Sequence, residues 1–104
     1  MTDYTAHVEV PDAAIGAVLH EAVLGQESVT CATLRSGNGT WLSFGVEAGS
    51  DDQATTTAAT VRYRVSQQGV TAVPVGYDQE SLHLFENAPM IITCGRTVIH
   101  SEGI

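Results

Sequence analysis

The fold is decided by residues 4–25, which read YTAHVEVPDAAIGAVLHEAVLG. Apolar and polar side chains alternate up to Pro11, which is the two-residue period of a strand with one buried face. Pro11 ends this strand, and Asp12 can cap the helix that follows. Apolar side chains then recur at steps of three and four residues, at Ala14, Ile15, Val18, Leu19, Ala22 and Val23. We therefore predict a strand over residues 4–10 and a helix over residues 12–24.

A β-hairpin is predicted after this helix. Residues 27–35 and 40–47 are rich in strand formers, and the turn cluster Ser36-Gly37-Asn38-Gly39 separates them. Both faces of the predicted hairpin carry some apolar side chains. We expect the hairpin either to be central in its sheet or to use one face for contact.

Residues 51–66 allow two interpretations. As a helix, they would have one apolar face made of Ala54, Ala58, Val61 and Val65. Three successive threonines disfavour that helix, because their side chains are β-branched. Residues 60–66 instead alternate between apolar and polar side chains, as a strand does. We expect a short helix or loop over residues 51–58, followed by a second hairpin that returns along residues 70–75.

The C-terminal quarter is predicted to form short strands at residues 81–86, 90–94 and 97–100. The middle one is apolar enough to lie buried within the sheet. The predicted fold class is therefore α+β: one domain over residues 1–104, with a single helix (12–24) packed on an antiparallel sheet of short strands. The alternative is a ferredoxin-like β-α-β-β-α-β order, which requires residues 51–66 to be helical.

The overall composition suits a folded domain and argues against a membrane protein. Of the 104 residues, 43% are apolar, which is enough for a packed core. No stretch approaches the roughly 18 consecutive apolar residues that span a bilayer. The net charge of −8 would also repel an anionic membrane surface. We expect no membrane association.

Direct binding to nucleic acid is not expected either. Such binding needs clustered basic side chains that neutralise phosphates. The chain has 12 acidic residues against four basic ones, and all four basic residues are arginines. Of these, Arg62 and Arg64 are the one pair that lies close together in the sequence.

The N-terminus and the two cysteines bear on the cellular compartment. The first residues lack the basic start and apolar run of a secretory signal, so we expect a cytoplasmic protein. Cys31 and Cys94 are then reduced. Both have apolar neighbours in the sequence, and we expect them to be small buried hydrophobic residues.

The sequence carries no signature of catalysis or of metal binding. The histidines at positions 7, 20, 83 and 100 and the two cysteines lack the short spacings of a zinc site. The Gly-x-Ser-x-Gly pattern of serine hydrolases is missing as well. His7 and His20 are expected at the surface. We therefore predict no catalytic residue, no metal ligand and no cofactor.

These features favour a non-catalytic binding or assembly module over an enzyme. Its expected partner is another protein, and a second copy of the chain is one such partner. The sheet should have open edges, and edges without lysine are poorly defended against pairing. Large side chains suit the centre of an interface, and the candidates are Trp41, Phe44, Tyr77 and Phe85.

Two other functions stay open. An acidic inhibitor or nucleic-acid mimic would occupy a basic partner, although the carboxylates here are scattered along the chain. A small-molecule-binding domain or small enzyme would instead bring together side chains such as Tyr63, Tyr77, His83 or His100 in a cleft.

Overall fold

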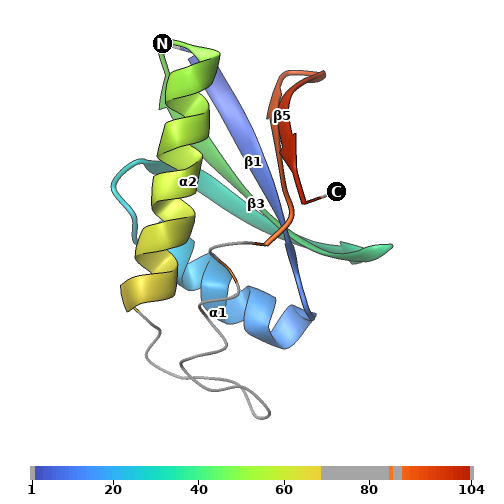
Figure 1. Ribbon diagram of the computed structural model, residues 1–104. Coiled ribbons are helices and arrows are strands. Elements are labelled where there is room, and N and C mark those ends of the chain that lie inside the picture. Colours follow the sequence, from blue (N-terminus) through green and yellow to red (C-terminus); the bar gives the residue numbers. More distant parts are fainter. Residues whose placement is uncertain (1, 69–84, 86–87, 104) are drawn as a thin grey trace.

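The computed structural model describes residues 2–68, 85 and 88–103, which form a five-stranded sheet and two helices (Figure 1). All neighbouring strands are antiparallel, in the spatial order β2-β3-β1-β4-β5. Both helices lie on the same face of the sheet. The predicted α+β class with an antiparallel sheet is confirmed. In chain order, the elements are β1 (Thr2–Val10), α1 (Ala13–Leu24), β2 (Val29–Gly37), β3 (Gly39–Ala48), α2 (Asp51–Gln68), β4 (Met90–Cys94) and β5 (Thr97–Glu102).

β1 and α1 form where the sequence predicts them. Every second side chain of β1 is buried, beginning at Tyr4. Asp12 caps α1, because its side chain accepts a hydrogen bond of 3.0 Å from the backbone N–H of Ile15. Gly16 lets the helix lie close to the sheet, since a Cβ at this position would be 2.8 Å from Cδ1 of Leu34. The predicted helix over residues 12–24 is therefore confirmed.

The predicted hairpin is present, but it lies at one edge of the sheet. β2 pairs with β3 along its length, and Gly39 closes the turn with a φ of 89°. Glycine tolerates this backbone conformation because it has no Cβ. β2 is the outermost strand, so the hairpin is not central. The central position expected for the hairpin is therefore wrong, and the use of one face for contact stays a prediction.

The single-helix arrangement is wrong, because residues 51–68 form a second helix. The strand expected at residues 60–66 is therefore the C-terminal half of α2. The first six elements now follow a β-α-β-β-α-β order, which matches the ferredoxin-like alternative only roughly because β5 is additional. The strands expected at residues 70–75 and over most of 81–86 lie outside the described residues.

Burial and hydrogen bonding explain why α2 is a helix. Its apolar positions at steps of three and four residues are all buried, and they are Ala54, Ala58, Val61 and Val65. A strand would have put Tyr63 on the same side as its apolar neighbours, but Tyr63 is 52% exposed. The hydroxyls of Thr55 and Thr60 donate to the carbonyls four residues earlier, at 3.0 and 2.8 Å. Neither described helix has the length and apolar character that crossing a bilayer requires.

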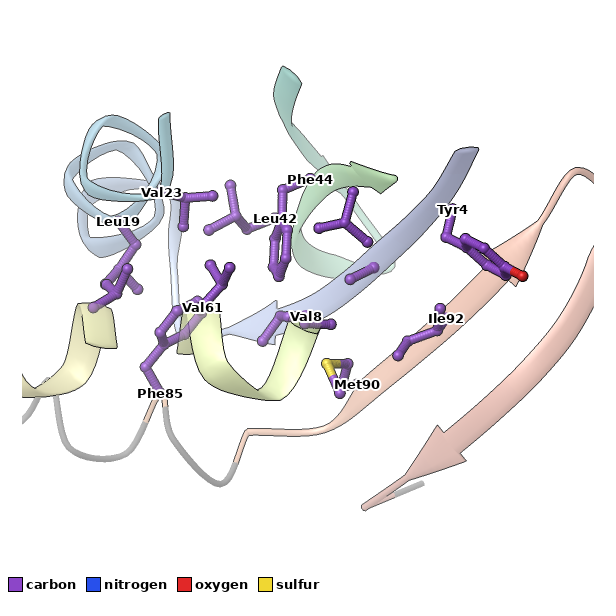
Figure 2. Packing of buried hydrophobic residues seen from close by; sticks show 14 of the residues in the cluster. Tyr4, Val8, Leu19, Val23, Leu42, Phe44, Val61, Phe85, Met90 and Ile92 are labelled. Carbon is purple, nitrogen blue, oxygen red and sulfur yellow. The ribbon is translucent and has the colours of Figure 1, made fainter. Parts of the chain in front are cut away.

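The last two strands agree with the predictions for residues 90–94 and 97–100. β4 pairs with both β1 and β5, so it lies inside the sheet as expected. Met90 and Ile92 point into the core, which lies between the helices and the covered face of the sheet (Figure 2). β5 forms the second edge of the sheet.

A polar cluster links α2 to the C-terminal strands on the covered side. Arg62 is 6% exposed, and its Nη1 donates to the carbonyl of Ala88 at 2.6 Å. Its Nη2 pairs with the Glu102 carboxylate, whose other oxygen lies 3.1 Å from Nε2 of His100. A buried guanidinium needs such partners, because an unpaired charge is costly in a core.

Candidate functional site

The candidate site is the face of the sheet against which neither described helix packs. Because side chains alternate along a strand, the residues between the core positions of β1, β3 and β4 point to this side. We call it the open face and define it by Thr5, His7, Cys31, Thr33, Arg35, Trp41, Ser43, Gly45, Ile91 and Thr93; Glu9 and Glu47 point to the same side of the sheet but lie outside this set. Nine of these residues, all except Thr93, line a hollow of about 580 Å³. That volume is in the range of small-molecule sites, about 300–1,000 Å³.

Gly45 lines the hollow and lets the side chains of β2 pack against β3. It lies in β3 between Thr5 of β1 and Cys31 of β2. A Cβ at Gly45 would be 2.6 Å from Oγ1 of Thr30 and 2.9 Å from Sγ of Cys31. The β-bulge between Val29 and Cys31 accounts for this crowding, because it sets two residues of β2 against one of β3. The side chains of Thr30 and Cys31 therefore fill the space that a side chain at position 45 would need.

The cysteine predictions need correction. Cys31 is exposed on the open face, and Cys94 is only partly buried. The prediction for Cys31 relied on its apolar neighbours in the sequence. β2 is an edge strand, so it has a neighbouring strand on one side only, and apolar neighbours in the sequence do not ensure burial there. Both thiols are free.

A row of three polar side chains crosses the centre of the open face. Nδ1 of His7 lies 2.7 Å from Oγ of Ser43, and its Nε2 lies 3.3 Å from Oγ1 of Thr93. The row joins β3, β1 and β4, so both ring nitrogens of His7 have hydroxyl neighbours. His7 is thus not the simple surface histidine that the sequence suggests. His20 also differs, since its Nε2 lies 3.1 Å from the Ala32 carbonyl on β2.

Electrostatics keep His7 neutral at pH 7. Burial lowers the pKa of His7 below its usual 6.5, and the nearby Arg35 guanidinium lowers this pKa further. Of the described side chains that line the hollow, Arg35 alone carries a formal charge at pH 7. No aspartate or glutamate is among these lining residues, in a chain that has 12 acidic residues. The hollow is therefore the less negative part of an acidic protein.

The lowered pKa of His7 predicts a specific loss of stability in acid. The unfolded chain has a histidine pKa of about 6.5, so below that pH it binds the proton more readily than the folded chain does. The contribution of His7 is present above pH 6.5 and is lost as the pH falls through its folded pKa. We expect the free energy of unfolding of the native chain to fall more steeply between neutral pH and about pH 5 than that of His7→Gln.

Urea unfolding followed by circular dichroism at several pH values measures this difference. Every other titratable group is common to the two proteins, so the comparison isolates His7. The carboxyl of Glu102 titrates in a lower window, since its hydrogen bond with His100 and the charge of Arg62 outweigh burial and lower its pKa below 4.5. Parallel curves for the two proteins would contradict the assignment of His7.

The structure separates the aromatic residues that were expected at an interface. Trp41 is partly buried and lies on the open face. Phe44 and Phe85 are 1% and 4% exposed, so they are core residues and their expected contact role is corrected. Trp41 and Phe44 are three positions apart in one strand and point to opposite sides, which is why both cannot serve one surface. Tyr77 lies outside the described residues.

Two of the side chains expected to converge in a cleft, Tyr63 and His100, lie away from this site. Tyr63 is exposed on α2, and His100 pairs with Glu102 on β5. His83, like Tyr77, lies outside the described residues. The polar row was missed because its members are far apart in the sequence. The alternation of side chains in β1 does place His7 on the face away from the core, and this pattern was the one sequence feature that could have pointed to the site.

Metal binding is not supported in the part of the chain that the structure describes, where no group of three or more histidine, cysteine or acidic side chains comes together. The hollow offers one imidazole, one thiol and hydroxyl groups, with no carboxylate among its lining residues. Such a set suits hydrogen bonding to a ligand more than ligation of an ion.

No protein-family model, no curated protein and no solved structure matches the chain.

Proposed function

We propose that the chain is a non-catalytic binding module whose contact surface is the open face, and whose partner is a protein, in the first place a second copy of itself. The observation that carries this proposal is an uncovered sheet face with Trp41 at its surface and no carboxylate among the residues that line its hollow. The free thiols of Cys31 and Cys94 suit a reducing cytoplasm, where we place this module.

The chemistry of the open face supports a contact role. The centres of protein interfaces are depleted of acidic residues and enriched in tryptophan and arginine. Trp41 and Arg35 are directly opposite each other in the β2–β3 pair, and Ile91 adds apolar surface from β4. A neutral His7 also loses less solvation than a charged one when a partner covers it.

The net charge favours this face for self-association. Two copies, each with a charge of −8, repel each other, so their contact is favoured where few carboxylates lie, as in the lining of the hollow. A twofold pair of open faces that meet at the hollow places both Trp41 side chains within the contact. Glu9, which is opposite Trp41 in the β1–β3 pair, lies outside the residues that line the hollow. Added salt screens the repulsion and should strengthen such a dimer. An acidic inhibitor bound to a basic partner would show the opposite salt dependence.

Sedimentation equilibrium at micromolar concentrations tests this proposal. We expect the native chain to dimerise, and Trp41→Ala to weaken the dimer by about tenfold or more, as substitution of a central interface aromatic does. Tyr63→Ala is the matched control, because Tyr63 is an exposed aromatic residue on α2. A native chain that stays monomeric, or a larger effect of Tyr63→Ala, would overturn the assignment.

A second candidate function is the binding of a small molecule in the hollow. The observation that favours it is the 2.7 Å contact between His7 and Ser43, which places a polar row beside Trp41 in a space of about 580 Å³. Ligand sites often combine apolar walls with a few fixed polar groups in this way.

A further inference from the structure

We propose that the hollow of the open face binds a small aromatic carboxylate, with Arg35 as its counter-charge and the Ser43–His7–Thr93 row as its hydrogen-bond donor. This inference rests on the second candidate function and names the chemical class of its ligand.

Charge complementarity selects an anion. Arg35 is the one formally charged side chain among the described residues of the hollow. Glu9 is opposite Trp41 in the β1–β3 pair, with β3 between it and Arg35, and does not line the hollow. The rest of the protein is strongly acidic, so an anion is repelled from most of the surface. Arginine forms two parallel, charge-assisted hydrogen bonds with a carboxylate, which makes it the suited basic residue for this ligand.

The polar row supplies a hydroxyl donor without any change in charge. A neutral His7 has one N–H and one bare nitrogen. When Nδ1–H donates to Oγ of Ser43 and the hydroxyl of Thr93 donates to Nε2, the Ser43 hydroxyl is left to donate to a ligand. In the other tautomer, Ser43 donates to Nδ1 and the Thr93 hydroxyl is left. A carboxylate beside Ser43 therefore selects the first tautomer.

The walls of the hollow select a flat apolar body. Trp41 is opposite Arg35 across the β2–β3 pair, so a ring stacked on the indole can carry a carboxylate within reach of the guanidinium. Ile91 lines the hollow from β4, and Gly45 and Cys31 line it from β3 and β2. An aromatic ring with one carboxylate satisfies the charged, the polar and the apolar groups together.

Trp41 is the single tryptophan of the chain, so its fluorescence reports directly on this site. Titration with benzoate should give a saturable change in Trp41 emission. Benzamide has the same ring without the charge, and its affinity should be lower than that of benzoate by at least about tenfold. Arg35→Gln should weaken benzoate binding by about tenfold or more, and Ser43→Ala by several-fold. Arg64→Gln is the matched control, because Arg64 is an exposed arginine on α2, on the other side of the sheet.

Three results would each overturn the inference: no saturable change with benzoate, equal binding of benzamide, or equal effects of Arg35→Gln and Arg64→Gln. Circular dichroism of every variant checks that it is folded. Sedimentation of the same samples separates this inference from self-association. Because the proposed dimer covers the hollow, benzoate is titrated at a concentration at which the chain is monomeric. Failure of benzoate to bind there removes only the ligand, and benzoate binding to a chain that stays monomeric at every micromolar concentration removes only the dimer.

Discussion

Replacing Phe44 by alanine is expected to lower the free energy of unfolding by about 3–5 kcal/mol, the usual cost of removing a buried phenylalanine ring. Phe44 is 1% exposed and lies among the side chains that β1, β3 and the helices contribute to the core (Figure 2). Its loss removes a large apolar surface and leaves a cavity that rigid neighbours fill only in part.

Trp41→Ala is the matched comparison for this prediction. Trp41 belongs to the same strand, but it lies on the open face and is only partly buried. We expect it to cost less than about 2 kcal/mol, since a partly exposed side chain loses less buried surface. Urea unfolding followed by circular dichroism measures both variants at a concentration below dimerisation. A larger cost for Trp41→Ala than for Phe44→Ala would contradict the assignment of the two faces.

The second large effect is expected at the polar cluster of the covered side. Arg62→Leu should lower the free energy of unfolding by about 2–4 kcal/mol, because it removes the partners of the Ala88 carbonyl and of the Glu102 carboxylate. The side chain of Glu102 is 41% exposed, so water replaces part of what it loses. The expected cost therefore stays below that of breaking a fully buried ion pair, about 3–5 kcal/mol.

Arg64→Leu controls for the loss of charge and for the effect of leucine on a helix. Arg64 is exposed on the same helix, and its replacement should change stability by less than about 0.5 kcal/mol. Arg62→Leu and Glu102→Gln should also be non-additive, since each removes one side of the same interaction. Equal costs at Arg62 and Arg64, or full additivity with Glu102, would show that the cluster does not hold α2 to β5.

The elements that could be predicted from the sequence are those whose patterns allow one period. Residues 4–25 switch from a two-residue period to steps of three and four at Pro11, and no other structure satisfies both halves. The turn at residues 36–39 is equally local, because its glycines and asparagine favour a tight connection.

α2 could not be predicted in this way, because Val61 and Val65 fit a strand period and a helix period equally well. The residue that separates the two structures is Tyr63, which a strand would bury and α2 leaves exposed. Side-chain hydrogen bonds at Thr55 and Thr60 also offset the resistance of threonine to helix formation. Tertiary packing of the apolar face decided the outcome.

The candidate site depends on strand order, which no local pattern contains. His7 and Ser43 are 36 positions apart, and His7 and Thr93 are 86 positions apart. They meet because β1 lies between β3 and β4 in the sheet. Large aromatic residues could be named from the sequence, but their side of the sheet followed only from the register.

The central claim, that the open face is the contact surface, is tested most directly by the amide resonances of the labelled protein in a dilution series. The account predicts concentration-dependent shifts that centre on Thr33, Trp41, Ser43 and His7, and resonances of the exposed side of α2 that do not move. Shifts confined to the helices, or spectra that are identical at all concentrations, would contradict it.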